Sequence, residues 1–129
     1  MTRNAIVEYL SGARRAVEIG IGKRDDVAKA LAESGVDVTA TDVHERPVPS
    51  DVRFVRDDVT DPTPSVYADA DLLYALNLPP ELQRPAWTVA REHDARFVFT
   101  TLGGDPATIP VSRTTVPGET LFEAMPERP

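Results

Sequence analysis

The residues best suited to chemistry are glycines and polar side chains that recur along the first two thirds of the chain. They are Glu18, Gly20, Gly22, Asp42, Asp58 and Asn77. Glycines let the backbone turn tightly and let a ligand approach without meeting a Cβ, and a following helix presents free N–H groups. Asp42 lies twenty residues beyond Gly22, the spacing at which a carboxylate accepts hydrogen bonds from both hydroxyls of a ribose. Together these residues predict a nucleoside pocket.

Each residue also has a purely structural interpretation. Gly20 and Gly22 can serve close helix packing, Asp42 can be a turn residue, and Asp58 can either reach an adenine amino group or cap a loop. The dinucleotide-binding fingerprint needs a third glycine three residues after the second, and Asp25 occupies that position. Its negative charge opposes a pyrophosphate, and Glu18 instead favours a ligand that carries a positive charge.

Strands and helices must alternate to bring these residues together. Short apolar or β-branched runs predict strands near residues 16–19, 36–41, 52–55, 71–76 and 95–101. Helical spacing predicts helices over residues 3–12, 27–34 and 80–93, whereas prolines predict loops at 43–50 and 62–64. We therefore expect one three-layer α/β Rossmann-like domain over residues 1–129, with a parallel sheet in the order 3-2-1-4-5 and room for a short C-terminal edge strand. Each polar residue then follows the carboxyl end of a strand, and residues 126–129 form a frayed tail.

Composition narrows the partners and the environment. Asp and Glu outnumber Lys and Arg by 21 to 14, which leaves a net charge of -7, and only Lys23 and Lys29 are lysines. Such a surface is typical of proteins that stay soluble at high salt, and it argues against broad binding to duplex nucleic acid. The chain has no cysteine, no apolar signal core and no membrane-spanning run, so we expect a cytoplasmic protein. Neither histidine has the carboxylate spacing of a metal site, and no metal is expected.

The order of these motifs resembles class I methyltransferases more than dehydrogenases. The resemblance implies that Glu18, Gly20 and Gly22 form the first motif, that Asp42 binds the ribose and Asp58 the adenine side, and that the cofactor is S-adenosylmethionine. Asn77-Leu78-Pro79-Pro80-Glu81 resembles the Asn-Pro-Pro-aromatic motif of amino-methylating enzymes, but it has Leu78 inserted and Glu81 in the place of the aromatic residue. Arg24 stands where many methyltransferases have a further glycine.

A closer resemblance rests on three segments: Val17 to Gly22, Phe54-Val55-Arg56-Asp57-Asp58-Val59-Thr60-Asp61-Pro62, and Leu78-Pro79-Pro80-Glu81-Leu82-Gln83. They are similar to a small archaeal family of uncharacterised proteins numbered 0146. This resemblance implies a minimal methyltransferase-like domain of archaeal origin, in agreement with the salt-adapted composition, and it implies no particular reaction.

Two classes of function stay open, and whether the protein is an enzyme is uncertain from sequence. One is a minimal methyltransferase with S-adenosylmethionine as its small ligand; catalytic residues are not identified, because the sulfonium is already activated and catalysis consists mostly of positioning. The other is a non-catalytic nucleotide-binding or assembly module, with an NAD-binding protein as a third alternative. A homodimer or a protein partner that completes the site is also compatible with the sequence.

Overall fold

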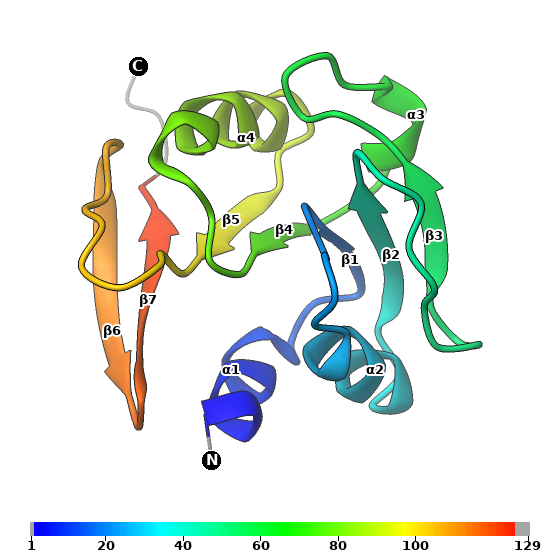
Figure 1. Ribbon diagram of the computed structural model, residues 1–129, viewed down its shortest axis with the longest axis horizontal. Coiled ribbons are helices and arrows are strands. Elements are labelled where there is room, and N and C mark those ends of the chain that lie inside the picture. The colour runs from blue at the N-terminus through cyan, green and yellow to red at the C-terminus, as the bar shows by residue number, and fades with distance from the viewer. Residues whose placement is uncertain (1, 126–129) are drawn as a thin grey trace.

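The computed structural model describes residues 2–125, and its elements follow one another mostly as strand then helix (Figure 1). The helices are α1 (Thr2–Leu10), α2 (Asp26–Glu33), α3 (Pro64–Tyr67) and α4 (Pro80–Glu92). The strands are β1 (Arg15–Glu18), β2 (Asp37–Asp42), β3 (Arg53–Arg56), β4 (Leu72–Ala75), β5 (Arg96–Phe99), β6 (Val111–Val116) and β7 (Glu119–Ala124).

All these strands join in one sheet with the order β3-β2-β1-β4-β5-β7-β6. The first five strands are parallel, as the sequence predicted, with Val17 opposite Thr39 on one side and Leu73 on the other. β7 runs antiparallel to β5 and to β6, so the predicted C-terminal edge is a hairpin whose turn is Pro117-Gly118. Gly118 has a φ of 82°, which favours glycine at this turn.

The sheet is the middle of three layers, with α1 and α2 on one face and α3 and α4 on the other (Figure 1). Successive strand residues point to opposite faces, so neighbouring side chains belong to different cores. In β4, Leu72 and Tyr74 pack with the α1–α2 core, whereas Leu73 and Ala75 pack with the α3–α4 core. This burial on both faces explains the continuous apolar run of a central parallel strand.

Two segments differ from the prediction. The loop expected around Pro62 and Pro64 contains the short helix α3, because Pro64 starts its first turn, where a missing N–H costs nothing. The predicted strand over residues 95–101 is shorter, because β5 comprises only Arg96–Phe99. The Thr100 Oγ1 that follows it accepts a hydrogen bond from the Asn77 N–H at 2.8 Å, in the segment between β4 and α4. The tail predicted for residues 126–129 lies outside the described residues. Within residues 2–125, no helix has the length and apolar character that crossing a bilayer requires.

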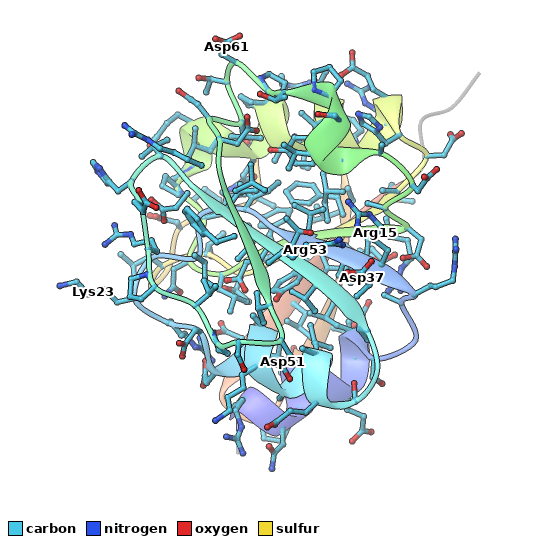
Figure 2. The ribbon with its side chains drawn as sticks, turned by 90° about the vertical axis from the view of Figure 1, so that its right-hand side faces the viewer. Arg15, Lys23, Asp37, Asp51, Arg53 and Asp61 are labelled. Atoms are coloured by element: carbon cyan, nitrogen blue, oxygen red, sulfur yellow. The ribbon has the colours of Figure 1, made fainter. Side chains whose placement is uncertain are left out.

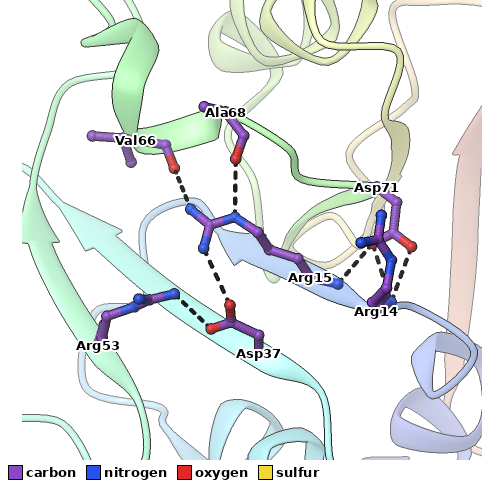
Figure 3. Close-up of polar contacts among 7 residues, drawn as sticks. All are labelled: Arg14, Arg15, Asp37, Arg53, Val66, Ala68 and Asp71. Carbon is purple, nitrogen blue, oxygen red and sulfur yellow. Dashed lines mark hydrogen bonds and ion pairs between the residues drawn. The ribbon is translucent and has the colours of Figure 1, made fainter.

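Polar side chains at the amino ends of the strands bind one another (Figure 3). Asp37, the first residue of β2, pairs with Arg53 at 2.6 Å and with Arg15 at 3.3 Å. Arg15 also donates from Nε to the Ala68 carbonyl at 3.0 Å, which ties α3 to β1. Figure 2 shows Arg15, Asp37 and Arg53 grouped over the sheet, whereas Lys23 and Asp61 point away from the molecule. The amino-end groups are thus used to hold the strands together.

The side chain of Asp71 links two strands at this end of the sheet. We expect Asp71→Ala to lower the free energy of unfolding by about 1–2 kcal/mol. Its carboxylate accepts the Arg14 N–H at 2.9 Å and the Arg15 N–H at 2.9 Å, which joins the start of β1 to the start of β4. Burial alone would raise the pKa of Asp71, but these N–H groups lower it. The stabilisation is therefore present at neutral pH and is lost on acidification. Urea unfolding at pH 7 and pH 3 measures it, with exposed Asp51→Ala as the control; equal losses at both pH values would contradict the assignment.

Candidate functional site

A small cavity of about 170 Å³ lies at the carboxyl ends of β1, β2 and β3. Its lining residues come from the ends of these strands, the loops that follow them, and the first turn of α4. They are Ile19, Gly20, Thr41, Asp42, Val43, Asp57, Asp58, Val59 and Leu82. Of the six predicted site residues, the structure places Gly20, Asp42 and Asp58 on this cavity. The position is the one at which open α/β sheets bind ligands.

Asp42 is buried, with 7% of its surface exposed, and it links the two loops that meet at the cavity. Its Oδ2 accepts the Gly22 N–H at 2.8 Å and its Oδ1 accepts the His44 N–H at 2.9 Å. Burial alone would raise the pKa of Asp42, but these two N–H groups and the nearby Arg46 lower it. Asp42 is consequently ionised at neutral pH, and each oxygen keeps a lone pair for a further donor.

Arg46 adds an unexpected feature beside Asp42. Its Nε lies 3.5 Å from Asp42 Oδ1, an ion pair without hydrogen-bond geometry, and this atom is buried without a hydrogen-bond partner. Buried donors without a partner are rare in proteins and mark sites where a further acceptor fits. Sequence reasoning missed Arg46, because residues 43–50 form a loop, in which a spacing of four residues does not bring two side chains together as it does on a helix.

Asp57 and Asp58, next to each other after β3, accept hydrogen bonds from different groups of the protein. Asp58 is exposed, and its Oδ1 accepts both the N–H and the hydroxyl of Thr60, at 2.9 and 2.7 Å, which lowers the pKa of the Asp58 carboxyl. Asp57 accepts the Thr63 N–H at 3.1 Å and the Tyr67 hydroxyl at 2.7 Å. Asp58 therefore caps a loop, as one of the two interpretations predicted, and it also lines the cavity.

Glu18 lies beneath the glycine loop and does not line the cavity. It is 1% exposed, and its Oε1 accepts a hydrogen bond from the Tyr74 hydroxyl at 2.7 Å. Tyr74 is fully buried and lies directly opposite Glu18 in the β1–β4 register, so both side chains point to the same face of the sheet. Burial raises the pKa of Glu18 to about 8, and the Tyr74 hydrogen bond and Arg24 offset only part of this effect.

Gly20 and Gly22 adopt the left-handed backbone that favours glycine, with φ values of 68° and 57°, and so provide the tight turn that the sequence predicted. Arg24, which stands in the place of a further glycine, turns toward Asp26 and pairs with it at 3.0 Å. The guanidinium is therefore not among the residues that line the cavity. Asp25 and Asp26 place two carboxylates at the start of α2, a position at which helices bind phosphate through free N–H groups.

Asn77 is exposed, adopts a φ of 54°, and is not part of the cavity lining. The inserted Leu78 is 3% exposed and packs into the α3–α4 core, while Pro79 and Pro80 begin α4. The two prolines of this segment therefore serve as the start of a helix. The side-chain amide of Asn77 stays on the surface, next to the end of β5.

Apolar side chains form the remaining walls of the cavity, and sequence reasoning did not assign them to a site. Val43 projects from the loop after β2 with 49% of its surface exposed, and Val59 and Leu82 come from other loops and from α4. Apolar walls with a few polar groups are typical of small-molecule sites. At about 170 Å³, the cavity is smaller than the roughly 300–1,000 Å³ of drug-sized sites, so it encloses only part of a nucleoside-containing ligand.

Solved structures with the same fold include methyltransferases, among them one with bound SAM and one named SAM-dependent. The magnesium protoporphyrin IX methyltransferase of Synechocystis PCC 6803 with bound SAM matches 95% of this chain and 76% of its own, with a TM-score of 0.66 and 13% identity. A TehB-like SAM-dependent methyltransferase of Corynebacterium glutamicum matches 94% of this chain and 84% of its own, with a TM-score of 0.62 and 18% identity. The chain therefore has the Rossmann-like methyltransferase fold.

The family can be stated more closely. The model of the uncharacterised protein family UPF0146 matches residues 2–126, and the chain belongs to this family. A UPF0146 protein of Halobacterium salinarum is 54% identical over 120 residues, which cover 92% of this chain and 93% of that protein. A UPF0146 protein of Archaeoglobus fulgidus is 42% identical and covers 78% of each chain. The predicted archaeal family and the predicted fold are both confirmed.

Proposed function

We propose that this protein binds an adenosyl ligand of the S-adenosylmethionine type, with the ribose at Asp42 and the adenine between Val43 and Leu82. The observation that carries the proposal is Asp42, a buried and ionised carboxylate held by two backbone N–H groups at the end of β2. A carboxylate held this way is already oriented, so little ordering cost opposes its binding to two hydroxyls.

The other groups have complementary roles in this pocket. Asp58 offers an acceptor to an adenine amino group, and Arg46, whose Nε lies 3.5 Å from Asp42 Oδ1, keeps a positive charge beside the ribose-binding carboxylate. The methionyl part lies outside the small cavity, over Gly20 and Gly22, where no Cβ obstructs it. Methyl transfer is the activity that this arrangement supports best, because a sulfonium needs positioning more than it needs a protein nucleophile.

The same loop disfavours a pyrophosphate. The Gly22 N–H is already donated to Asp42, and the carboxylates of Asp25 and Asp26 repel phosphate at the start of α2. NAD is therefore expected to bind poorly.

Calorimetric titration at high salt with S-adenosylmethionine, S-adenosylhomocysteine and NAD tests the proposal. We expect saturable binding of the first two and none of NAD. Asp42→Ala should weaken binding by at least about 30-fold, because the loss of charge-assisted hydrogen bonds costs about 2 kcal/mol. Saturable NAD binding without binding of the adenosyl compounds would refute the proposal.

A second variant separates binding from folding, since Asp42→Ala also leaves two backbone N–H groups without their acceptor. Val43→Arg places a long side chain at the mouth of the cavity on an exposed position. We expect it to weaken binding without a change in urea unfolding. The matched control is Val55→Arg, which alters a comparably exposed valine, 37% exposed, on β3 outside the cavity.

A non-catalytic binding module is the second candidate, and the position of Asn77 favours it. Asn77 carries the amide of the motif that resembles amino-methylating enzymes, and it lies on the surface without the aromatic partner. Turnover distinguishes the two functions, because ligand binding is expected in either case. Only a methyltransferase would convert S-adenosylmethionine to S-adenosylhomocysteine when a protein or RNA extract from a UPF0146-containing archaeon is supplied.

A further inference from the structure

The strand at one edge of the sheet has an open side. β6 is the last strand in the sheet order, and within residues 2–125 it pairs only with β7 (Figure 1). The Met125 N–H donates to the Pro110 carbonyl at 2.9 Å, so the backbone at position 110 faces β7. Because this direction alternates along an antiparallel strand, the N–H and C=O groups of Val111, Arg113 and Thr115 face away from the sheet. Among the described residues these outward groups have no strand partner.

The opposite edge of the sheet is protected in ways that β6 is not. β3 has only four residues, and it begins and ends with arginine, Arg53 and Arg56. Short length and charged side chains keep edge strands from pairing with other chains. β6 has six residues, of which five are valine, serine or threonine, and none is acidic although the chain has 21 acidic residues. The β6 edge is therefore the one suited to the addition of a strand.

A second copy of this chain fits the β6 edge without a like-charge contact. In a twofold dimer the two β6 strands run antiparallel, and residues whose backbone faces outward form the hydrogen-bonded pairs. An axis at Arg113 would place two arginines directly opposite each other, which is unfavourable. An axis at Thr114 instead places Arg113 opposite Thr115 of the second copy and keeps residues 112–116 paired. An axis at Ser112 pairs fewer residues of β6, so the register about Thr114 is favoured.

A groove beside β6 gives the second copy further contacts on the face that carries α1. The groove has a volume of about 470 Å³ and lies between α1 and the end of β6. Its lining residues are Asn4, Ala5, Glu8, Tyr9, Val116 and Pro117. Val116 packs against the α1–α2 core, and the register about Thr114 places Ser112 of the second copy opposite it on the same face. Side-chain contacts at the groove therefore add to the strand pairing.

The charge of the chain makes this association depend on salt. Each copy carries a net charge of -7, so two copies repel each other at low ionic strength. The Debye length falls from about 10 Å at 0.1 M salt to about 3 Å at 1 M, which screens this repulsion. The edge strand itself contributes no negative charge to the repulsion. Association should therefore be stronger at high salt.

We infer that this protein forms a twofold dimer in which β6 strands of two copies pair antiparallel about Thr114 and join the two sheets into one. The adenosyl cavity lies at the ends of β1, β2 and β3, on the other half of the sheet. The dimer leaves this cavity open, so dimerisation does not depend on the proposed ligand.

Sedimentation velocity over a range of protein concentrations, at 0.1 M and at 1 M KCl, measures the association. We expect a monomer–dimer equilibrium in the micromolar range that shifts toward the dimer at 1 M KCl. Thr115→Pro removes an outward N–H from each edge and leaves the hydrogen bonds to β7 in place, so it should raise the dimer Kd by at least about tenfold. Thr115→Val keeps the N–H and should keep the dimer. Urea unfolding checks that both variants fold.

Thr114→Cys tests the register by a second measurement that does not depend on the proline variant. The chain has no cysteine, so the introduced thiol can form a disulfide only between two copies. On the axis, the two Thr114 positions form a non-hydrogen-bonded pair with Cα atoms about 4.5 Å apart, within reach of a disulfide. In the matched control Ser112→Cys, the two positions lie about 13 Å apart. Mild oxidation should cross-link the first variant and not the second.

Two results would overturn the dimer. One is a monomer at every concentration and salt, with no preferential cross-linking of Thr114→Cys, which would leave β6 as an edge for a different protein strand. The other is a dimer that Thr115→Pro leaves intact and that Thr114→Cys does not cross-link, because the interface would then lie on another surface. Ligand titration of Thr115→Pro should match that of the natural protein in either case.

Discussion

Glu18→Gln is expected to make the stability of the protein nearly independent of pH between pH 5 and pH 8, where the natural protein loses stability as pH rises. The pKa of Glu18 is raised from 4.5 to about 8 on folding. In that interval the folded state binds a proton that the unfolded state has released, so the free energy of unfolding falls by about 1.4 kcal/mol per pH unit. The expected loss is on the order of 3–4 kcal/mol, a large part of a typical domain's stability.

Urea unfolding at several pH values, for both proteins, measures this difference. The side-chain amide introduced by Glu18→Gln can accept the Tyr74 hydrogen bond as the protonated carboxyl does, so the two proteins should have similar stability near pH 5. Glu33→Gln, on the exposed side of α2, should follow the natural protein throughout. Parallel pH profiles for the natural protein and Glu18→Gln would show that Glu18 is ionised in the folded state.

Gln83→Met is expected to lower the free energy of unfolding by about 2–3 kcal/mol, because it removes the polar link between α4 and the loop after β5. Gln83 is fully buried; its Nε2 donates to the Pro106 carbonyl at 3.0 Å, and its Oε1 accepts the Thr108 N–H at 2.6 Å. Methionine keeps the volume but leaves both backbone groups without these partners.

The neighbouring substitution Leu82→Met is the matched control for this experiment. It changes an apolar side chain on the same helix for one of similar volume and should cost less than about 1.5 kcal/mol. Hydrogen exchange at Thr108 provides a local readout, since we expect this amide to lose protection in Gln83→Met. An equal loss of stability in the two variants would mean that packing, and not the polar link, holds the loop.

The local pattern of residue types was sufficient to predict most helices and strands of the chain. Short β-branched runs, helical spacing and prolines predicted all five parallel strands and the helices α1, α2 and α4, because side-chain periodicity depends only on which face of an element is buried. α3 was missed because four residues are too few to show a helical period. β6 and β7 were anticipated only as edge strands, since the pairing of β7 with β5 joins segments far apart in the sequence.

The sequence also determined the order of the polar residues along the carboxyl edge, and with it the position of Gly20, Asp42 and Asp58 at one cavity. Only the tertiary structure decided what each of them does there. It turned Glu18 away from the cavity onto Tyr74, because the β1–β4 register places these two residues opposite each other on the same face. It also set Arg24 against Asp26 and left Asn77 on the surface. Spacing along a chain predicts which strand end a side chain follows, but burial, ionisation and partners depend on groups that distant segments bring into contact.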